Sequence, residues 1–175
     1  MTVASRMGVS VLSVSAVVAA CATQRGGSAD SSAAAADTTT IVSLDRGACH
    51  GMCPIYTVFV QMNGGVRFTG TRFVRPVGAD SARIGSADVS ALQAAFSTRQ
   101  FERLPSTIER DSPGCGPYVA DLPTVELTVS GERGAHRVRW DEGCRDHPRV
   151  LDTLARLVDS VSGTSRWTTV PRPSR

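Results

Sequence analysis

Apolar and polar residues alternate along two neighbouring segments, residues 56–62 and residues 66–70. Alternation with a period of two is typical of strands that bury one face. Asn63 and Gly64 lie between the segments, and this dipeptide is a strong signal for a tight β-turn. The pattern therefore predicts a β-hairpin over residues 55–74, and a further short strand is predicted at residues 41–44.

A second hairpin is predicted over residues 124–140, where the alternation returns. The residues expected to face inward are Val125, Leu127, Val129, Val138 and Trp140. A turn centred on residues 132–133 places Leu127 opposite Val138 and Glu126 opposite Arg139. The apolar faces of the two strands then agree, which favours this register.

Helical spacing replaces the alternation in two places. Val89, Leu92 and Phe96 predict a helix with Ser86 as its N-cap and Asp88 in its first turn. Phe101 and Leu104 extend this apolar set into a loop. A last helix is predicted with Pro148 in its first turn. Its expected buried face is Leu151, Leu154, Leu157 or Val158, and Val161.

The predicted order is hairpin, helix, hairpin, helix. Strands that are joined as hairpins and interrupted by helices predict the α+β class. The expected architecture is an antiparallel sheet built from two β-hairpins, with two helices packed on one face. A chain of 175 residues favours one such domain.

The N-terminus has a different pattern. Arg6 precedes an apolar run of 12 residues at 9–20, which is too short to span a bilayer and fits the core of a secretory signal peptide. The stretch Val18-Ala-Ala-Cys21 resembles the lipobox of bacterial lipoproteins. The resemblance implies cleavage before Cys21 and a lipid attached to its sulfur. The alternative is an ordinary signal peptide, with Cys21 incidental.

These signals divide the chain into four parts. Residues 1–20 are predicted to be a lipoprotein signal peptide, and residues 21–40 the lipidated Cys21 with a flexible tether that contains no large apolar residue. Residues 41–170 are the predicted α+β domain, and residues 171–175 a disordered tail. Ala22, and not Asp, follows the cysteine. Similar lipoproteins of two-membrane envelopes with this feature usually reach the outer membrane. The expected location is the cell envelope, at the periplasmic face of the outer membrane.

Charge and composition exclude some function classes. The net charge is +3, from 19 basic and 16 acidic residues, which is too balanced for the concentrated basic footprint of a nucleic-acid binder. The sequence contains no G-x-S-x-G motif, no glycine-rich phosphate loop and no His-x-x-x-His pair. His50, His136 and His147 are interpreted as surface residues. No catalytic activity and no cofactor are predicted.

Five cysteines are present, and assigning Cys21 to the lipid leaves four. Four cysteines allow three pairings in an oxidising compartment. The favoured interpretation is two structural disulfides, Cys49 with Cys53 and Cys115 with Cys144. On the chain-entropy model these would stabilise the fold by about 2 and about 3.5 kcal/mol.

A copper or thiol-redox site is the alternative for the first pair. The Cys-x3-Cys-Pro spacing resembles the site of Sco-type copper chaperones, and Cys49, His50, Met52 and Cys53 are all ligands that suit copper. Those chaperones have a thioredoxin fold, whereas this chain lacks the βαβ order. A redox pair usually lies at a helix N-terminus, whereas this motif precedes a strand. A disulfide is therefore favoured.

The segment Cys49-x-Gly51-x-Cys53-Pro54-x-Tyr56 resembles the signature of an uncharacterised bacterial domain family of small secreted and lipoprotein modules. Further matches are a hairpin with Gly65 and Gly70, Phe101-x-x-Leu104, Asp121-x-Pro123 and a leucine-rich helix at 150–161. The family usually has an aromatic residue where this chain has His50. The resemblance implies fold and location, and no activity.

The function expected from the sequence is binding or structural. The partners expected are the membrane, through the lipid on Cys21, and an envelope protein or polymer that meets the sheet face or an open strand edge. Arg67, Arg137 and Arg139 are interpreted as part of a solvated sheet face that pairs with Glu126, with a surface for anionic ligands as the less favoured alternative. A periplasmic copper or redox function of Cys49 and Cys53 is the rival hypothesis.

Overall fold

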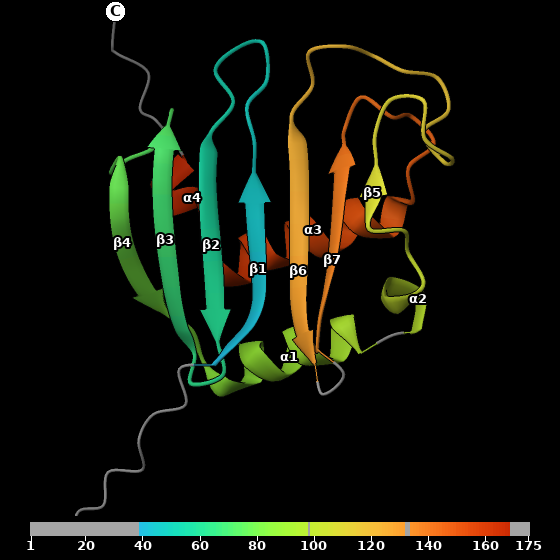
Figure 1. The fold of residues 1–175 in the computed structure, drawn as a ribbon. Coiled ribbons are helices and arrows are strands. Elements are labelled where there is room, and N and C mark those ends of the chain that lie inside the picture. Colours follow the sequence, from blue (N-terminus) through green and yellow to red (C-terminus); the bar gives the residue numbers. More distant parts are fainter. Residues whose placement is uncertain (1–38, 98, 132–133, 169–175) are drawn as a thin grey trace, which may run out of the picture. The chain divides into compact units, whose positions relative to one another are not determined.

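The computed structural model describes residues 39–97, 99–131 and 134–168. The predictions of a signal peptide, of a lipid on Cys21, of a tether (apart from its last two residues) and of a disordered tail lie outside these ranges. The described residues form one mixed sheet of seven strands, mostly antiparallel, with helices on one face (Figure 1). The α+β class is therefore confirmed. In the described ranges, no helix is long and apolar enough to cross a bilayer.

The strands lie in the spatial order β4-β3-β2-β1-β6-β7-β5. Their bounds are β1 Thr40–Arg46, β2 Ile55–Gln61, β3 Gly65–Arg72, β4 Gly78–Arg83, β5 Thr107–Ile108, β6 Thr124–Gly131 and β7 Gly134–Asp141. The short β5 pairs parallel with β7, whereas every other pair of neighbouring strands is antiparallel. The N-terminal strand β1 lies in the middle of the sheet, between β2 and β6.

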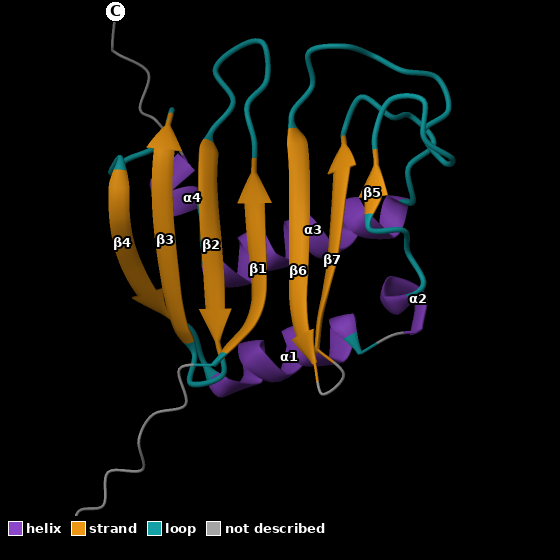
Figure 2. Cartoon of the chain, viewed as in Figure 1, coloured by secondary structure: helices purple, strands orange, loops and turns teal. Residues whose placement is uncertain are grey.

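Two helices of several turns cross the same face of the sheet (Figure 2). The helices of the described chain are α1 Ser86–Phe96, α2 Arg99–Glu102, α3 Arg149–Ser162 and α4 Ser165–Thr168. Helix α1 begins one residue earlier than predicted, because Gly85 and not Ser86 is its N-cap. The Gly85 N–H donates to the carboxylate of Asp88 at 3.2 Å, which satisfies one of the first free amides of the helix.

The two predicted hairpins are present, and the register of the second is confirmed. Leu127 lies opposite Val138, and Glu126 lies opposite Arg139. Val125, Leu127, Val138 and Trp140 are all buried. The buried face of α3 contains Leu151, Leu154, Ala155, Val158 and Ser162, while Leu157 and Val161 are partly buried beside it.

Two hairpins do not describe the whole sheet. Strand β3 was expected to continue to Val74, but it ends at Arg72, and the chain turns and returns as the edge strand β4. Most β4 residues are exposed, so their sequence carries no inward alternation that could predict a strand. Backbone pairing with β3 holds β4 in place. The two-residue β5 is too short for any period to be visible in the sequence.

Trp167 of α4 completes the core over the β3–β4 side of the sheet. Its ring stacks on Phe68 with 4.4 Å between the ring centroids. Its indole N–H donates to Asp80 of β4 at 2.7 Å. A single aromatic side chain therefore covers the end of the core and holds the edge strand.

Candidate functional site

The loop between β1 and β2 contains the first cysteine pair. Cys49 and Cys53 form a disulfide with a Cα–Cα distance of 5.8 Å. The N–H of His50 donates to the carbonyl of Asp121 at 3.0 Å, so a second loop, before β6, supports the first. Met52 lies at the outer side of the loop with 82% of its surface exposed.

The copper alternative depends on the state of this pair. The two sulfurs are bonded to each other in the structure, whereas copper ligation at Cys49, His50, Met52 and Cys53 needs free thiolates. Among the described residues, no group of three or more His, Cys, Asp or Glu side chains could hold a metal ion. A copper or redox role of the reduced pair stays a prediction.

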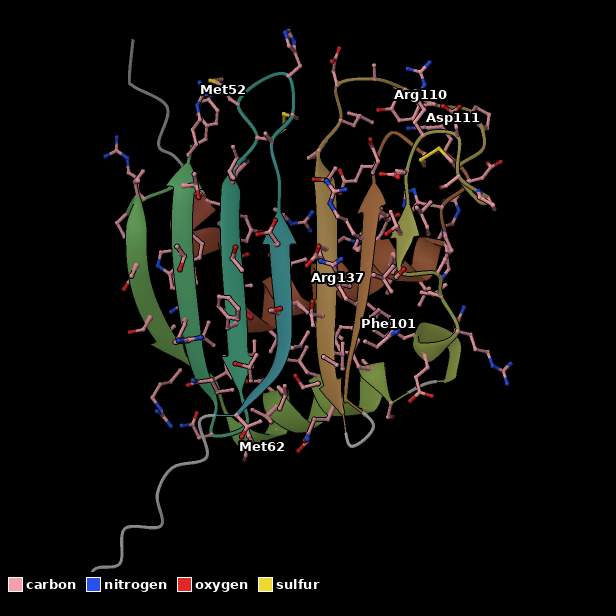
Figure 3. All side chains as sticks on the ribbon, viewed as in Figure 1. Met52, Met62, Phe101, Arg110, Asp111 and Arg137 are labelled. Atoms are coloured by element: carbon pink, nitrogen blue, oxygen red, sulfur yellow. A yellow bond between two sulfur atoms is a disulfide. The ribbon has the colours of Figure 1, made fainter. Side chains whose placement is uncertain are left out.

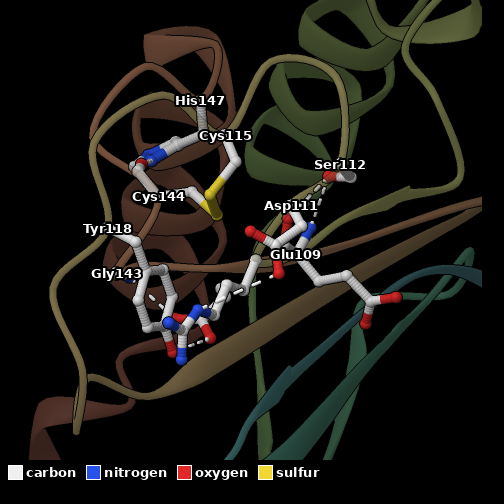
Figure 4. Close-up of a disulfide and its surroundings, with 10 residues drawn as sticks. Glu109, Asp111, Ser112, Cys115, Tyr118, Gly143, Cys144 and His147 are labelled. Carbon is white, nitrogen blue, oxygen red and sulfur yellow. Dashed lines mark hydrogen bonds and ion pairs between the residues drawn. A yellow bond between two sulfur atoms is a disulfide. The ribbon is translucent and has the colours of Figure 1, made fainter.

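The second cysteine pair joins the long loop before β6 to the loop that follows β7 (Figure 4). Cys115 and Cys144 are both buried, and their Cα atoms are 4.3 Å apart. The hydroxyl of Tyr118 donates to Asp141 at 3.0 Å, and this hydrogen bond raises the pKa of Tyr118. The other carboxylate oxygen of Asp141 accepts from the N–H of Gly143 at 2.7 Å. These bonds give this corner a structural role.

A partly buried polar network lies between the sheet and α3. The Arg46 guanidinium donates to one carboxylate oxygen of Asp159 through Nε at 2.9 Å and Nη2 at 2.7 Å. The other oxygen of Asp159 accepts from Tyr56 at 2.6 Å and Thr164 at 2.9 Å. Glu142 lies 3.3 Å from Nη1 of the same arginine.

Burial and Asp159 set the ionisation of this network. Burial raises the pKa of the Tyr56 hydroxyl, and the Asp159 carboxylate raises it further. Burial alone would lower the pKa of Arg46, but the charge and hydrogen bonds of Asp159, together with Tyr56 and Glu142, outweigh it, so that the pKa is raised. Arg46 thus stays charged and Tyr56 stays protonated. Because each donor has a carboxylate partner on α3 or beside it, the network attaches α3 to the sheet.

Sequence reasoning missed this network, although one signal was available. Arg46 continues the inward phase of Val42 and Leu44, so a charged residue stands where β1 should be apolar. A charge at an inward strand position requires a partner of opposite charge. The partner, Asp159, lies 113 residues away on α3, and no local pattern could identify it.

An open cavity lies at the opposite end of β1, between α1 and the sheet; we call it the α1 groove. Its volume is about 650 Å³. Val42, Leu92, Phe96 and Phe101 form its buried apolar floor. Gln93, Ser97, Glu102 and Ser130 supply exposed polar side chains at its rim. Met62, beside Gln93, and Phe101, beside Phe96, line two parts of the groove (Figure 3).

His136 brings a polar atom into this apolar surface. Its ring packs edge-on against Phe101 at 5.2 Å between centroids. The Nε2 atom is buried, and it makes no hydrogen bond with any described residue. A buried polar atom without a partner costs about 1–3 kcal/mol. A bound molecule with a polar group could supply the missing hydrogen bond.

The interpretation of His136 as a surface residue was therefore wrong. Its position in β7 shares the inward phase of Val138 and Trp140, and it pairs with Val129. That phase was visible in the sequence, so the orientation of His136 could have been inferred. His50 is exposed as expected, whereas His147 is partly buried and lies 2.9 Å from Asp152.

The open face of the sheet carries the arginines singled out in the sequence. Glu126 lies directly opposite Arg139, but its carboxylate pairs diagonally with Arg137, at 3.4 Å. Arg67 lies over the ring of Phe59 at 5.0 Å. In the described part of the chain no helix covers this face (Figure 2).

These features define a disulfide-bonded α+β domain with an open apolar groove under its first helix. The chain belongs to the family DUF6438, a domain of unknown function, whose model matches residues 40–162. The match covers every strand and both long helices. No curated protein matches the chain.

Proposed function

We propose that this protein is a lipid-anchored domain of the cell envelope that binds a small amphiphilic molecule in the α1 groove. One observation carries the proposal: an open apolar cavity of about 650 Å³ contains a buried histidine nitrogen without a partner among the described residues. Cavities of about 300–1,000 Å³ with an apolar lining and few polar groups are typical of ligand sites.

The lining indicates the chemistry of the ligand. Phe96 and Phe101 offer aromatic faces to an alkyl chain. His136 Nε2 can donate or accept a hydrogen bond, depending on its tautomer. A single-chain amphiphile with one carboxyl or hydroxyl group, such as a fatty acid, satisfies both requirements.

The sequence supports the proposed location. The apolar run at 9–20 followed by Cys21 resembles a lipoprotein signal, and two disulfides suit an oxidising compartment. A domain held at the periplasmic face of the outer membrane would lie close to lipids and to their single-chain breakdown products.

A fluorescent fatty acid tests the proposal. Dansyl-undecanoic acid should bind the purified protein saturably with a rise in fluorescence, and dodecanoic acid should displace it. Gln93→Trp places a large ring over the groove and should lower the affinity on the order of tenfold, equivalent to about 1.4 kcal/mol. The matched control is Ser90→Trp, an exposed position of α1 outside the lining, which should leave the affinity unchanged.

Two results would contradict a groove site for amphiphiles. One is probe binding that both tryptophan variants leave unchanged, which would place the probe elsewhere. The other is a protein that binds neither fatty acids nor fatty alcohols but binds an apolar peptide, with Gln93→Trp weakening that peptide binding.

A further inference from the structure

We propose that the end of the domain opposite the α1 groove docks on an anionic lipid bilayer. The loop-end patch that makes this contact consists of Met52, Phe73 and Val77, with the basic side chains His50, Arg72 and Arg75. The contact is separate from the α1 groove and does not depend on what the groove binds.

The apolar members of the patch are exposed at the tips of two neighbouring loops. Met52 is 82% exposed and Val77 is 68% exposed, and Phe73 is partly exposed between them in the sequence. Met52 belongs to the β1–β2 loop, and the other two belong to the β3–β4 connection. Because Ile55 of β2 pairs with Arg72 of β3, both loops emerge from the same end of the sheet (Figure 1).

The structure holds these loops rigidly although their tips face solvent. The Cys49–Cys53 disulfide and the bond from His50 N–H to Asp121 fix the first loop. In the second loop Val74 is buried, and the Arg75 N–H donates to the carbonyl of Trp167 at 2.8 Å. A loop whose backbone is already held in place loses little backbone conformational freedom when it binds.

Phe73 adds a backbone outlier to the patch. Its φ is +55°, in the left-handed region that bulky L residues rarely adopt. The guanidinium of Arg72 lies over the Phe73 ring at 4.6 Å. Such outliers gather at binding sites, where the surrounding structure maintains them for a purpose other than stability.

Charge complementarity identifies the partner. The six residues of the loop-end patch include Arg72 and Arg75 and no Asp or Glu, and the exposed Asp121 lies beside them, where its carbonyl accepts from the N–H of His50. Apolar side chains flanked by arginine match the boundary between headgroups and acyl chains of an anionic membrane. A protein partner would need a separate pocket for each of the protruding tips, whereas a bilayer accepts all of them together.

The length of the N-terminal segment allows this contact beside a lipid on Cys21. Residues 22–40 number 19, and a chain of that length spans at most about 65 Å. The strands, with up to eight residues, are about 25 Å long. The loop end can therefore reach the membrane that holds the anchor, even though β1 begins at the other end of the sheet.

Vesicle co-sedimentation of the full chain carrying Cys21→Ser tests the proposal without the lipid. The protein should bind phosphatidylglycerol vesicles more tightly than phosphatidylcholine vesicles. Met52→Ser with Val77→Ser, and separately Arg72→Gln with Arg75→Gln, should each weaken binding on the order of tenfold. The matched control at other surfaces is the pair Arg103→Gln with Arg156→Gln, which should change it less than about twofold. The apolar segment at 9–20 is common to all these proteins, so only differences between them are compared.

A tryptophan probe then reports insertion. The emission of Met52→Trp should shift to the blue on anionic vesicles, whereas that of Ser90→Trp, at an exposed position of α1 outside the groove lining, should not. The proposal is overturned if the patch and control variants bind alike, if neutral vesicles bind equally well, or if Met52→Trp gives no shift. Binding of polyglutamate in preference to vesicles would assign the patch to an acidic protein instead and would also overturn it.

Discussion

Arg46 and Asp159, 113 residues apart in the sequence, are joined by two hydrogen bonds from one guanidinium to one carboxylate oxygen. Their side chains are only 21% and 20% exposed. Removing one partner of such a poorly hydrated charge pair lowers the stability of the fold, because the remaining charge keeps its desolvation cost.

Asp159→Asn should therefore lower the free energy of unfolding by about 2 kcal/mol, less than for a fully buried pair because some solvent reaches the site. Urea denaturation measures the change. Glu126→Gln is the matched control, since its partner Arg137 is 59% exposed, and it should cost about 0.5 kcal/mol or less. Equal losses in the two variants would mean that Arg46 and Asp159 do not hold α3 to the sheet.

Tyr56 predicts a loss of stability at alkaline pH. Its pKa is raised in the folded protein, whereas an unfolded tyrosine ionises near its ordinary pKa of about 10. Above that pH the unfolded state binds fewer protons than the folded state, so the free energy of unfolding falls as pH rises. The fall should approach about 1.4 kcal/mol per pH unit, between about pH 10 and the folded pKa.

Comparing Tyr56→Phe with the original protein isolates this contribution, because Tyr118 is present in both. The variant should be less stable near pH 8, where it lacks the hydrogen bond to Asp159, and should lose less stability between pH 8 and about pH 11. Parallel losses in the two proteins would show that Tyr56 ionises normally.

Replacing His136 should raise the stability of the free protein and weaken its binding of amphiphiles. His136→Phe keeps an aromatic ring against Phe101 but removes the buried nitrogen without a described partner. The ligand-free variant should be more stable by about 1 kcal/mol, because the desolvation cost of that atom disappears. Its affinity for dodecanoic acid should fall on the order of tenfold, while a hydrocarbon probe without a polar group binds as before. A variant that loses stability would show that Nε2 already has a good partner in the free protein.

A thiol count without reductant tests the cysteine assignments. If the protein is extracted from membranes and alkylated, Cys49, Cys53, Cys115 and Cys144 should remain unlabelled, with each pair two hydrogens lighter than its reduced form. Cys21 should carry lipid. Labelling of Cys49 and Cys53 alone would favour the copper or redox hypothesis, and Cu(I) should then raise the melting temperature of the reduced protein.

Replacing each cysteine pair by alanine measures its contribution. On the chain-entropy model, the loss should be about 3.5 kcal/mol for Cys115 and Cys144, whose separation is 29 residues, and about 2 kcal/mol for Cys49 and Cys53, with a separation of 4. The reverse order would indicate that the short loop stabilises the fold by more than closure entropy.

The strands that could be predicted from the sequence are those with one buried face. In β6 and β7 the alternation fixed the register down to Leu127 opposite Val138, because a slip by one residue would expose the whole apolar set. Strand β4 could not be predicted, because backbone pairing and the bond from Trp167 to Asp80 hold it, and neither leaves a period in the sequence.

The α1 groove was equally hidden, for a different reason. Its floor consists of Val42, Leu92, Phe96 and other residues that read as ordinary core positions in the sequence. Whether such residues meet or leave a cavity depends on how α1 lies across the sheet, which periodicity does not determine. The one local signal of this cavity was the position of His136, which lies on the inward side of β7 with Val138 and Trp140.

The central position of β1 has a consequence for the order of folding. The β2–β3–β4 meander and the β6–β7 hairpin can each form from nearby residues, but within the sheet it is β1 that joins them, through Val42 with Val60 on one side and with Val129 on the other. The second of these pairings closes a loop of more than eighty residues, which is a slow step. Nearly the whole domain must therefore leave the ribosome or an export channel before β1 can pair with β6.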